Sequence, residues 1–212
     1  MCADYEDVAI TRSQFLVSYT CDVRPTATAQ HRIREWVETG GRWVALHGTN
    51  CALDGVGYRP VETPRIFPDW ADTLGSQFIA HPPIQPYTVE ISDSSNWLVA
   101  GIEPFDTDDE LYLSEYPHRA ELQPLLHTTW QGEARGFAES DWTACDPTHL
   151  VMYLRPLGKG AVLYNTLGHC RGHYDMAPVL DFYPAVDRCS WDKPVFYELL
   201  RRSLRWARGE TS

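Results

Sequence analysis

The feature that most constrains the fold is a short apolar run that follows two glycines and ends in a histidine. The run covers residues 43–46, directly after Gly40-Gly41 and Arg42, and His47 and Gly48 follow it. Such a run is short and apolar enough to be a strand buried on both faces. Gly40 can adopt the left-handed conformation that ends a helix, so the glycines mark the end of an element upstream.

The segments before this run predict a parallel crossover. Residues 15–19 are apolar enough for a short buried strand. Residues 27–39 indicate a helix, because Ile33, Trp36 and Val37 form one apolar stripe. A strand, a helix and a second strand at this spacing form a crossover between parallel neighbours. The sequence therefore predicts an α/β sheet.

The rest of the chain predicts further elements of the same domain. A short helix is expected at residues 69–74, strands at 87–91, 111–113 and 124–129, a hairpin of 150–154 with 161–167, and loops at 92–109, 130–147 and 170–191. The last helix is the clearest element, with Asp192 as its expected cap and Pro194 in its first turn. Its expected apolar face consists of Phe196, Leu199, Leu200, Leu204 and Ala207.

Composition narrows the class of protein. A length of 212 residues favours a single domain spanning 1–212, in which residues 1–14 are weakly patterned. A net charge of −11 disfavours nucleic acid as a partner, and the arginines near the C-terminus indicate a solvated helix face. No apolar run could span a membrane, and the acidic N-terminus does not resemble a secretory signal. Six cysteines without a C-x-x-C pair favour free thiols in the cytoplasm.

Four polar side chains occur where strands begin or end. In open α/β sheets, ligands bind beyond the carboxyl ends of the strands. His47 and His169 each follow a predicted strand and sit next to a glycine. His81 precedes two prolines that stiffen its loop, and Glu110 ends an acidic run directly before an apolar segment. We expect these four side chains to share one cleft. The alternative for His47 and His169, which their positions make the weaker one, is a packed histidine bonded to a loop carbonyl, and for His81 alone the two interpretations are about equal.

Two kinds of chemistry fit this set. The imidazoles of His47, His81 and His169 could bind zinc or a similar divalent ion. Alternatively, His47, Glu110 and His169 could act as acid and base on a polar substrate. Cys51 lies near His47 but lacks a nucleophile motif, so a cysteine hydrolase ranks last. The sequence contains no P-loop and no G-x-G-x-x-G, and we expect no nucleotide cofactor.

Several of these segments together resemble the ThuA-like (trehalose utilisation) family, a branch of the class I glutamine amidotransferase-like fold. The matching pieces are Trp36-Val37 through Gly40-Gly41 to His47-Gly48, Gly75 and Phe78 through His81-Pro82 to Gln85 and Val89, Asp109-Glu110-Leu111-Tyr112, Gly158-Lys159-Gly160 to Gly168-His169, and the final helix. The resemblance implies a flavodoxin-like three-layer sandwich with its site at the strand ends. It also implies a role with a small-molecule carbohydrate, such as trehalose or another disaccharide.

The resemblance shapes the expected roles of the site. His47 stands where amidotransferases carry the nucleophilic cysteine, so we expect no cysteine-dependent glutamine hydrolysis. His81, Tyr112 and Gly48 would contact the substrate, with Tyr112 orienting it. A non-catalytic carbohydrate-binding or regulatory domain is the alternative to an enzyme. The usual first strand and helix have no counterpart here, so an apolar sheet edge should be exposed, and a homo-oligomer stays open.

Overall fold

The predicted crossover organises the first third of the fold. A computed structural model describes residues 4–57, 60–171 and 186–211. In it, β1 (Phe15–Tyr19) and β2 (Arg42–Leu46) pair in parallel, and α1 (Ala27–Glu38) connects them. The hydroxyl of Thr26 caps α1 by accepting a hydrogen bond from the amide of Ala29. Gly40, at φ 126°, turns the chain into β2 as expected.

The main sheet has seven strands, and it is parallel only at the end that contains β1 and β2. The strand order is β1-β2-β9-β8-β7-β4-β5. The bounds of the other five strands are β4 Gln85–Ile91, β5 Phe105–Asp109, β7 Gln123–Thr129, β8 Thr148–Leu157 and β9 Gly160–Asn165. The first three strands in this order are parallel, and the other pairs are antiparallel. The predicted hairpin is therefore confirmed as β8 and β9.

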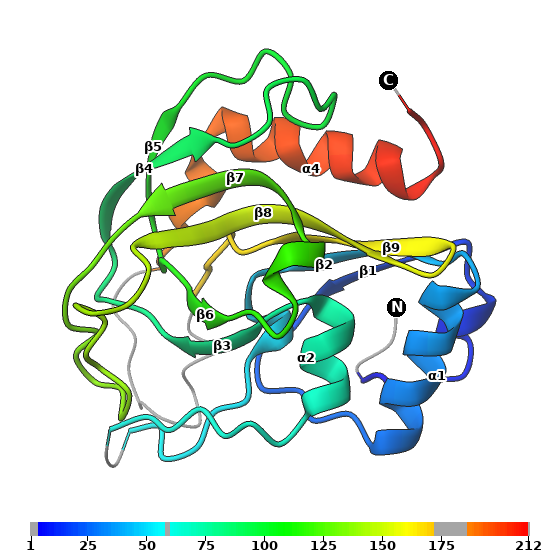
Figure 1. Ribbon diagram of the computed structural model, residues 1–212, viewed down its shortest axis with the longest axis horizontal. Helices are drawn as coiled ribbons and strands as arrows, with labels where there is room; N and C mark the ends of the chain where they lie inside the picture. The colour runs from blue at the N-terminus through cyan, green and yellow to red at the C-terminus, as the bar shows by residue number, and fades with distance from the viewer. Residues whose placement is uncertain (1–3, 58–59, 172–185, 212) are drawn as a thin grey trace.

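Helices cover both faces of this sheet, which gives three layers. Figure 1 shows α1 and α2 (Pro68–Leu74) on one side and α4 (Pro194–Ala207) on the other. Alternate residues of β2 face the two layers: Trp43 and Ala45 join the cluster under α1, and Val44 and Leu46 join the cluster under α4. The α/β sandwich with a strand buried on both faces is thus confirmed.

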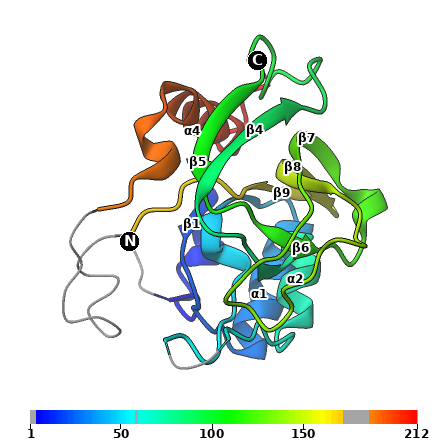
Figure 2. The same cartoon turned by 90° about the vertical axis from the view of Figure 1, so that its left-hand side faces the viewer.

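A second, two-stranded sheet completes the framework. It pairs β3 (Gln77–Ala80) with β6 (Leu113–Glu115) in antiparallel fashion. Within the described parts of the chain, four short 3-10 turns connect other elements, at Ile10–Arg12, His47–Asn50, Arg119–Glu121 and Cys189–Asp192. Figure 2 shows β4 and β5 rising beside α4, so the main sheet curls strongly toward that helix.

Three sequence-based expectations need correction. Strand β5 lies inside the segment predicted as a loop. Its residues 106–109 alternate between exposed and buried positions, as they do in a strand with one buried face. The strand predicted at 111–113 instead covers Leu113–Glu115. Helix α4 begins after Lys193, and Asp192 pairs with Arg188 instead of capping the helix.

The apolar face of α4 also differs from the prediction. Leu204 is 45% exposed, whereas Trp206, which the prediction left out, is buried.

The N-terminal segment is better packed than its sequence suggests. The ring of Tyr5 lies 4.6 Å from that of Trp70, and Ile10 is buried in the same cluster. These aromatic contacts fix residues 5–10 against the α1 side of the sheet.

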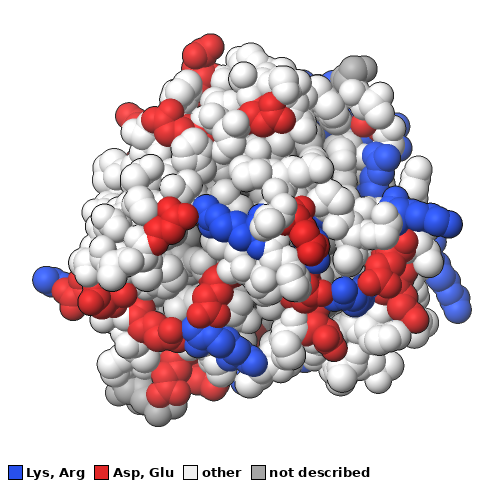
Figure 3. Space-filling view, viewed as in Figure 1, with Lys and Arg blue, Asp and Glu red and all other residues white. Residues whose placement is uncertain are grey.

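Charged side chains of both signs are intermixed on the surface. Figure 3 shows lysine and arginine lying among the acidic side chains of one face. The arginines of α4 are paired: Arg201 and Arg202 both contact Glu198, and Arg205 contacts Glu210. The prediction of a solvated helix face holds for the exposed Arg201 and Arg208, whereas Arg202 is partly buried and donates to the carbonyls of Trp97 and Ala100. Among the described residues, no helix combines the length and apolar character needed to cross a bilayer.

Candidate functional site

His47 occupies a strained turn at the carboxyl end of β2. Its φ of 45° is in the left-handed region, which a residue with a side chain rarely adopts. The turn directs the buried imidazole away from the strand and into the site. Nδ1 donates a hydrogen bond to the carbonyl of Thr166 at 2.9 Å, so the ring presents Nε2 to its neighbours.

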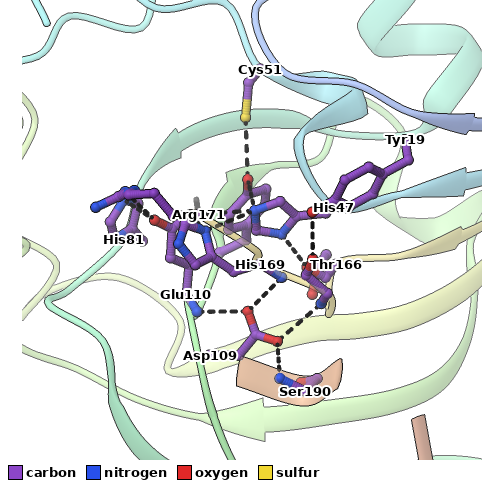
Figure 4. A network of polar contacts seen from close by, with 12 residues as sticks. Tyr19, His47, Cys51, His81, Asp109, Glu110, Thr166, His169, Arg171 and Ser190 are labelled. Carbon is purple, nitrogen blue, oxygen red and sulfur yellow. Dashed lines mark hydrogen bonds and ion pairs between the residues drawn. The ribbon is translucent and has the colours of Figure 1, made fainter. Parts of the chain in front are cut away.

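Glu110 follows β5 directly and lies at the centre of the site. Figure 4 shows His47, His81 and His169 around its carboxylate. Oε2 lies 3.4 Å from Nε2 of His47 and 3.1 Å from Nδ1 of His169. Oε1 lies 3.4 Å from Nε2 of His81. The predicted convergence of these four side chains is therefore what the structure shows.

The carboxylate of Asp109 holds two of these segments together. Oδ1 accepts hydrogen bonds from the amides of Glu110 and His169, at 2.8 and 3.1 Å. Oδ2 accepts from the amides of Gly168 and Ser190, at 2.9 and 3.3 Å. Asp109 thus fixes the loop after β9 against the end of β5. The sequence did not indicate this role, because Asp109 belongs to an acidic run. The other aspartates of that run, Asp106 and Asp108, are exposed.

His169 is buried and has one unsatisfied ring nitrogen. Its Nδ1 lies 3.4 Å from Nε2 of His47 as well as next to Glu110. Nε2 is buried without a hydrogen-bond partner among the described residues. An orphaned polar atom in a buried site costs free energy unless a ligand or water satisfies it. His173, four residues further along the chain, lies outside the described residues.

His81 forms the more open side of the site. Its Nδ1 donates to the carbonyl of Pro82 at 2.8 Å, which leaves Nε2 facing Glu110. The ring packs between Phe78 and Phe137, with centroids 6.0 and 4.8 Å away. Its side chain is 20% exposed, compared with 7–8% for His47, Glu110 and His169. Among the four side chains, His81 is therefore the one best placed to exchange protons with a bound ligand.

Tyr112 contacts His47, and Gly48 allows two backbone segments to approach each other closely. The Tyr112 hydroxyl lies 3.1 Å from Nε2 of His47 and 3.5 Å from Sγ of Cys51. A Cβ added to Gly48 would lie 2.6 Å from the Thr20 carbonyl oxygen and 2.9 Å from Cβ of Cys21. The space beside Gly48 is therefore filled by the chain that leaves β1. Close approach of that chain explains the glycine without a ligand.

Arg171 is a member of the site that the sequence reasoning did not single out. Its guanidinium Nη2 lies 3.1 Å from Oε1 of Glu110. Backbone hydrogen bonds in both directions with Asp187 fix its position. Oε1 therefore faces Arg171 and His81, whereas Oε2 faces His47 and His169. The only signal in the sequence is its place two residues after His169.

Burial and the mutual contacts shift the ionisation of these groups. Burial alone would raise the pKa of Glu110, but hydrogen bonds from His169 and His47 outweigh it and hold that pKa well below its usual range. Burial would likewise lower the pKa of His47, but Glu110 outweighs it and raises that pKa. Burial dominates at His81 and lowers its pKa. Near neutral pH, the site thus combines a carboxylate with an imidazole that remains neutral at His81.

The spacing of three donor atoms fits a tetrahedral metal ion. Nε2 of His47, Nδ1 of His169 and Oε2 of Glu110 are 3.1 to 3.4 Å apart. Zinc bonds of about 2.05 Å at tetrahedral angles place neighbouring ligand atoms roughly 3.3 Å apart. Metal-ligating histidines characteristically donate their other nitrogen to a carbonyl or carboxylate. His47 does so through Thr166, whereas the other nitrogen of His169 has no such partner among the described residues.

The aromatic side chains nearest to the site are not the tryptophans of the segments predicted as loops. Trp97, Trp130 and Trp142 lie in those segments, where an indole could stack on a sugar. Trp130 and Trp142 pack with one hydrophobic cluster around Leu113, and Trp97 packs with the cluster under α4. The aromatic rings nearest to His47 are instead those of Tyr112 and Tyr19, with centroids 4.7 and 6.2 Å away.

Comparison with known families agrees with the resemblance carried by the motifs. Residues 3–183 match the sequence model of ThuA, described as trehalose utilisation. The chain belongs to the ThuA family. No curated protein sequence is similar enough to count as a match. Membership covers most of the chain, and it includes all four converging side chains and Tyr112.

Two solved ThuA-like proteins have a similar fold. A putative ThuA-like protein from Bacteroides uniformis superposes with a TM-score of 0.65 at 15% identity, over 99% of this chain and 74% of the other. One from Parabacteroides merdae gives 0.66 at 15% identity, over 94% and 72%. At this identity the likeness concerns the fold. It agrees with the three-layer sandwich seen here.

Proposed function

We propose that this ThuA-family protein is a metal-dependent enzyme that acts on a sugar or sugar derivative. His47, Glu110 and His169 would hold a divalent ion such as zinc. The observation that carries the proposal is the separation of their three donor atoms, 3.1 to 3.4 Å, on three buried side chains. A bound divalent ion would supply a Lewis acid that polarises a substrate oxygen.

The surrounding groups support this division of roles. Thr166 fixes the tautomer of His47, so that the neutral ring offers Nε2 as a ligand atom. Of the two Glu110 oxygens, Arg171 pairs with Oε1, whereas Oε2 faces His47 and His169. It would therefore balance the carboxylate charge without blocking the three donors. The same arrangement explains why a buried carboxylate is tolerated between three imidazoles.

Proton transfer is the role we assign to His81. Its lowered pKa keeps the ring neutral near pH 7, and its Nδ1–H is already committed to Pro82. Nε2 is then available to take a proton from the substrate and to return it. Tyr112 would orient the substrate: once His47 is a ligand, the Tyr112 hydroxyl no longer has Nε2 as its acceptor.

Cysteine chemistry is poorly supported at this site. Cys51 is buried, and burial raises the pKa of its thiol well above the usual range. A thiol of this kind is a weak nucleophile at neutral pH. His47, not a cysteine, occupies the strained turn after β2. A carbohydrate substrate is favoured by membership of the trehalose utilisation family.

The test combines metal analysis with turnover. Purified protein should contain close to one equivalent of a divalent ion, and removing it with a chelator should abolish turnover. Trehalose, other disaccharides and their keto derivatives form the substrate panel. We expect His47→Ala and Glu110→Gln to lose both the metal and turnover, and His81→Gln to keep the metal and lose turnover.

Two results would contradict the proposal. One is turnover that Glu110→Gln and His47→Ala leave unchanged. The other is saturable sugar binding with no product after long incubation of metal-loaded protein, which would favour a binding or regulatory domain. Glu115→Gln is a suitable control, because Glu115 is exposed and pairs with Arg65 outside the site.

A further inference from the structure

We propose that a cavity between residues 114–119 and 142–149 binds a neutral sugar the size of one pyranose ring. The cavity has a volume of about 240 Å³. At about 30 Å³ per water molecule, it has room for a small ligand of several water volumes. Its walls share no residue with the set of His47, Glu110 and His169, so the cavity is independent of the proposed metal site.

Two buried polar side chains in the walls have unused hydrogen-bonding capacity. His149 is 3% exposed, and its Nε2–H donates to the carbonyl of Trp130 at 2.9 Å. Nδ1 then carries a lone pair, which has no partner among the described residues. Ser114 is 7% exposed, and its hydroxyl makes no hydrogen bond within the same part of the chain. Because unsatisfied polar groups cost free energy, both atoms call for a polar ligand or water in the cavity.

Tyr116 adds a donor to the same walls. Its hydroxyl accepts a hydrogen bond from the amide of Leu150 at 3.0 Å. Burial raises the pKa of this hydroxyl to about 12, so it stays protonated at neutral pH. Its own O–H has no acceptor among the described residues. With His149 and Ser114, the cavity thus offers donors and acceptors together, which suits sugar hydroxyls because they do both.

The charges around the cavity favour a neutral ligand. Nη2 of Arg119 lies 3.7 Å from Oδ2 of Asp146, so the two charges largely balance. Burial lowers the pKa of His149, which leaves the ring neutral near pH 7. An anion would meet the Asp146 carboxylate and the Nδ1 lone pair, and a cation would meet Arg119. Trp142 adds an aromatic wall, against which the C–H groups of a pyranose ring can pack.

Cys145 reports on this cavity in the unmodified protein. Its exposed thiol belongs to the walls, whereas the exposed Cys21 lies outside them, beside Gly48. Peptide mass spectrometry follows the alkylation of both thiols by iodoacetamide. The reaction is run without sugar and with roughly tens of millimolar methyl α-D-glucopyranoside, glucuronate or glucosamine, because a small ligand of this kind binds weakly.

Variants of the unsatisfied groups test the contacts directly. Calorimetry measures the affinity for methyl α-D-glucopyranoside in Ser114→Ala and in His149→Gln, which keeps a donor for Trp130 but lacks Nδ1. His127→Gln is the matched control, because His127 lies on β7, bonds to Ser92 and is not part of the walls. Thermal melts check that each variant folds.

We expect methyl α-D-glucopyranoside to slow alkylation of Cys145 at least about threefold and to leave Cys21 unchanged, with glucuronate and glucosamine less effective. Ser114→Ala and His149→Gln should each weaken binding about three- to tenfold, and His127→Gln less than about twofold. Glu110→Gln should keep the full protection of Cys145, even though it removes a proposed metal ligand.

Three results would overturn the assignment. The first is alkylation of Cys145 at the same rate with and without the neutral sugar, or stronger protection by glucuronate or glucosamine. The second is wild-type affinity in folded Ser114→Ala and His149→Gln. The third is protection that Glu110→Gln abolishes, because the sugar would then bind at the proposed metal site. None of these results bears on metal binding by His47, Glu110 and His169, which metal analysis tests separately.

Discussion

The carboxylate of Asp109 accepts a hydrogen bond from the backbone amide of His169 at 3.1 Å, across 60 residues of sequence. This contact ties the loop after β9 to the end of β5, and so places His169 beside Glu110. Two donors bind each oxygen of the same carboxylate, and Asp109 is only 1% exposed. Asp109 is therefore a positioning residue for the site, without contacting the proposed metal position.

Replacing Asp109 with asparagine should loosen the site. The amide of asparagine would place N–H groups against the N–H groups of Gly168 and Ser190. Buried donors left without acceptors cost about 1–3 kcal/mol, so the free energy of unfolding should fall by that amount. Zinc affinity should fall about tenfold or more, as is typical when outer support of a metal ligand is lost. Denaturant melts and zinc titration measure the two effects.

The matched control for Asp109→Asn is Asp108→Asn. Asp108 is exposed and contacts Lys193 at 3.6 Å, so its loss should change stability and zinc affinity little. If Asp109→Asn and Asp108→Asn behaved alike, the role assigned to Asp109 would be wrong.

The stability of the metal-free protein should depend on pH through Glu110 and His47. The pKa of Glu110 is lowered in the fold, so its contribution is present above about pH 4.3 and is lost as the pH falls through the folded pKa. The pKa of His47 is raised, so its contribution is present below about pH 6.5 and is lost as the pH rises through the folded pKa. The two contributions coincide between these values.

Comparison with Glu110→Gln isolates this effect. The difference in melting temperature between metal-free wild type and Glu110→Gln should be largest between about pH 4.3 and 6.5. It should shrink on both sides of that window. A difference that grew steadily from pH 6 to pH 9 would contradict the coupling of Glu110 with His47.

The cysteines should react with iodoacetamide at very different rates. Cys21 is exposed, and a hydrogen bond from Cys51 lowers the pKa of its thiol. Cys51 is buried, and burial raises its pKa. Peptide mass spectrometry should therefore find Cys21 alkylated before Cys145, and Cys51 last of the three. Rapid alkylation of Cys51 in the folded protein would reopen the case for a cysteine nucleophile.

Gly48→Ala should destabilise the turn after β2. The added Cβ would meet the Thr20 carbonyl oxygen at 2.6 Å, and backbone atoms cannot rotate away from it. Overpacking of this kind costs about 1–3 kcal/mol. Denaturant melts test this effect, with Val17→Ala controlling for general loosening of β1.

The sequence was most informative where local chemistry determines structure. The apolar run before His47 and the stripe of α1 were sufficient to predict the crossover from β1 to β2. Parallel strands place their carboxyl ends at one edge, which is why His47 and His169 could be expected to meet. Glu110 and His81 joined the prediction because each borders an apolar or proline-rich segment.

The remaining features depend on contacts between distant segments. Asp109 and Asp108 are adjacent and chemically identical, and only the fold buries one of them. β5 is rich in aspartate, a poor strand former, and it exists because it pairs with β4. Arg171 and Tyr19 reach the site through a guanidinium and a ring whose directions the sequence does not specify. In each of these examples, contacts between segments that are distant in sequence determine where the side chain or strand lies.

The most direct measurement is a crystal structure of the zinc-soaked protein with anomalous scattering at the zinc edge. The account predicts one strong peak about 2.0–2.2 Å from Nε2 of His47, Nδ1 of His169 and Oε2 of Glu110. It also predicts that Glu110→Gln crystals soaked in the same way lack the peak. A fully occupied ion bound elsewhere, with Glu110 still paired to His169 and His47, would contradict the account.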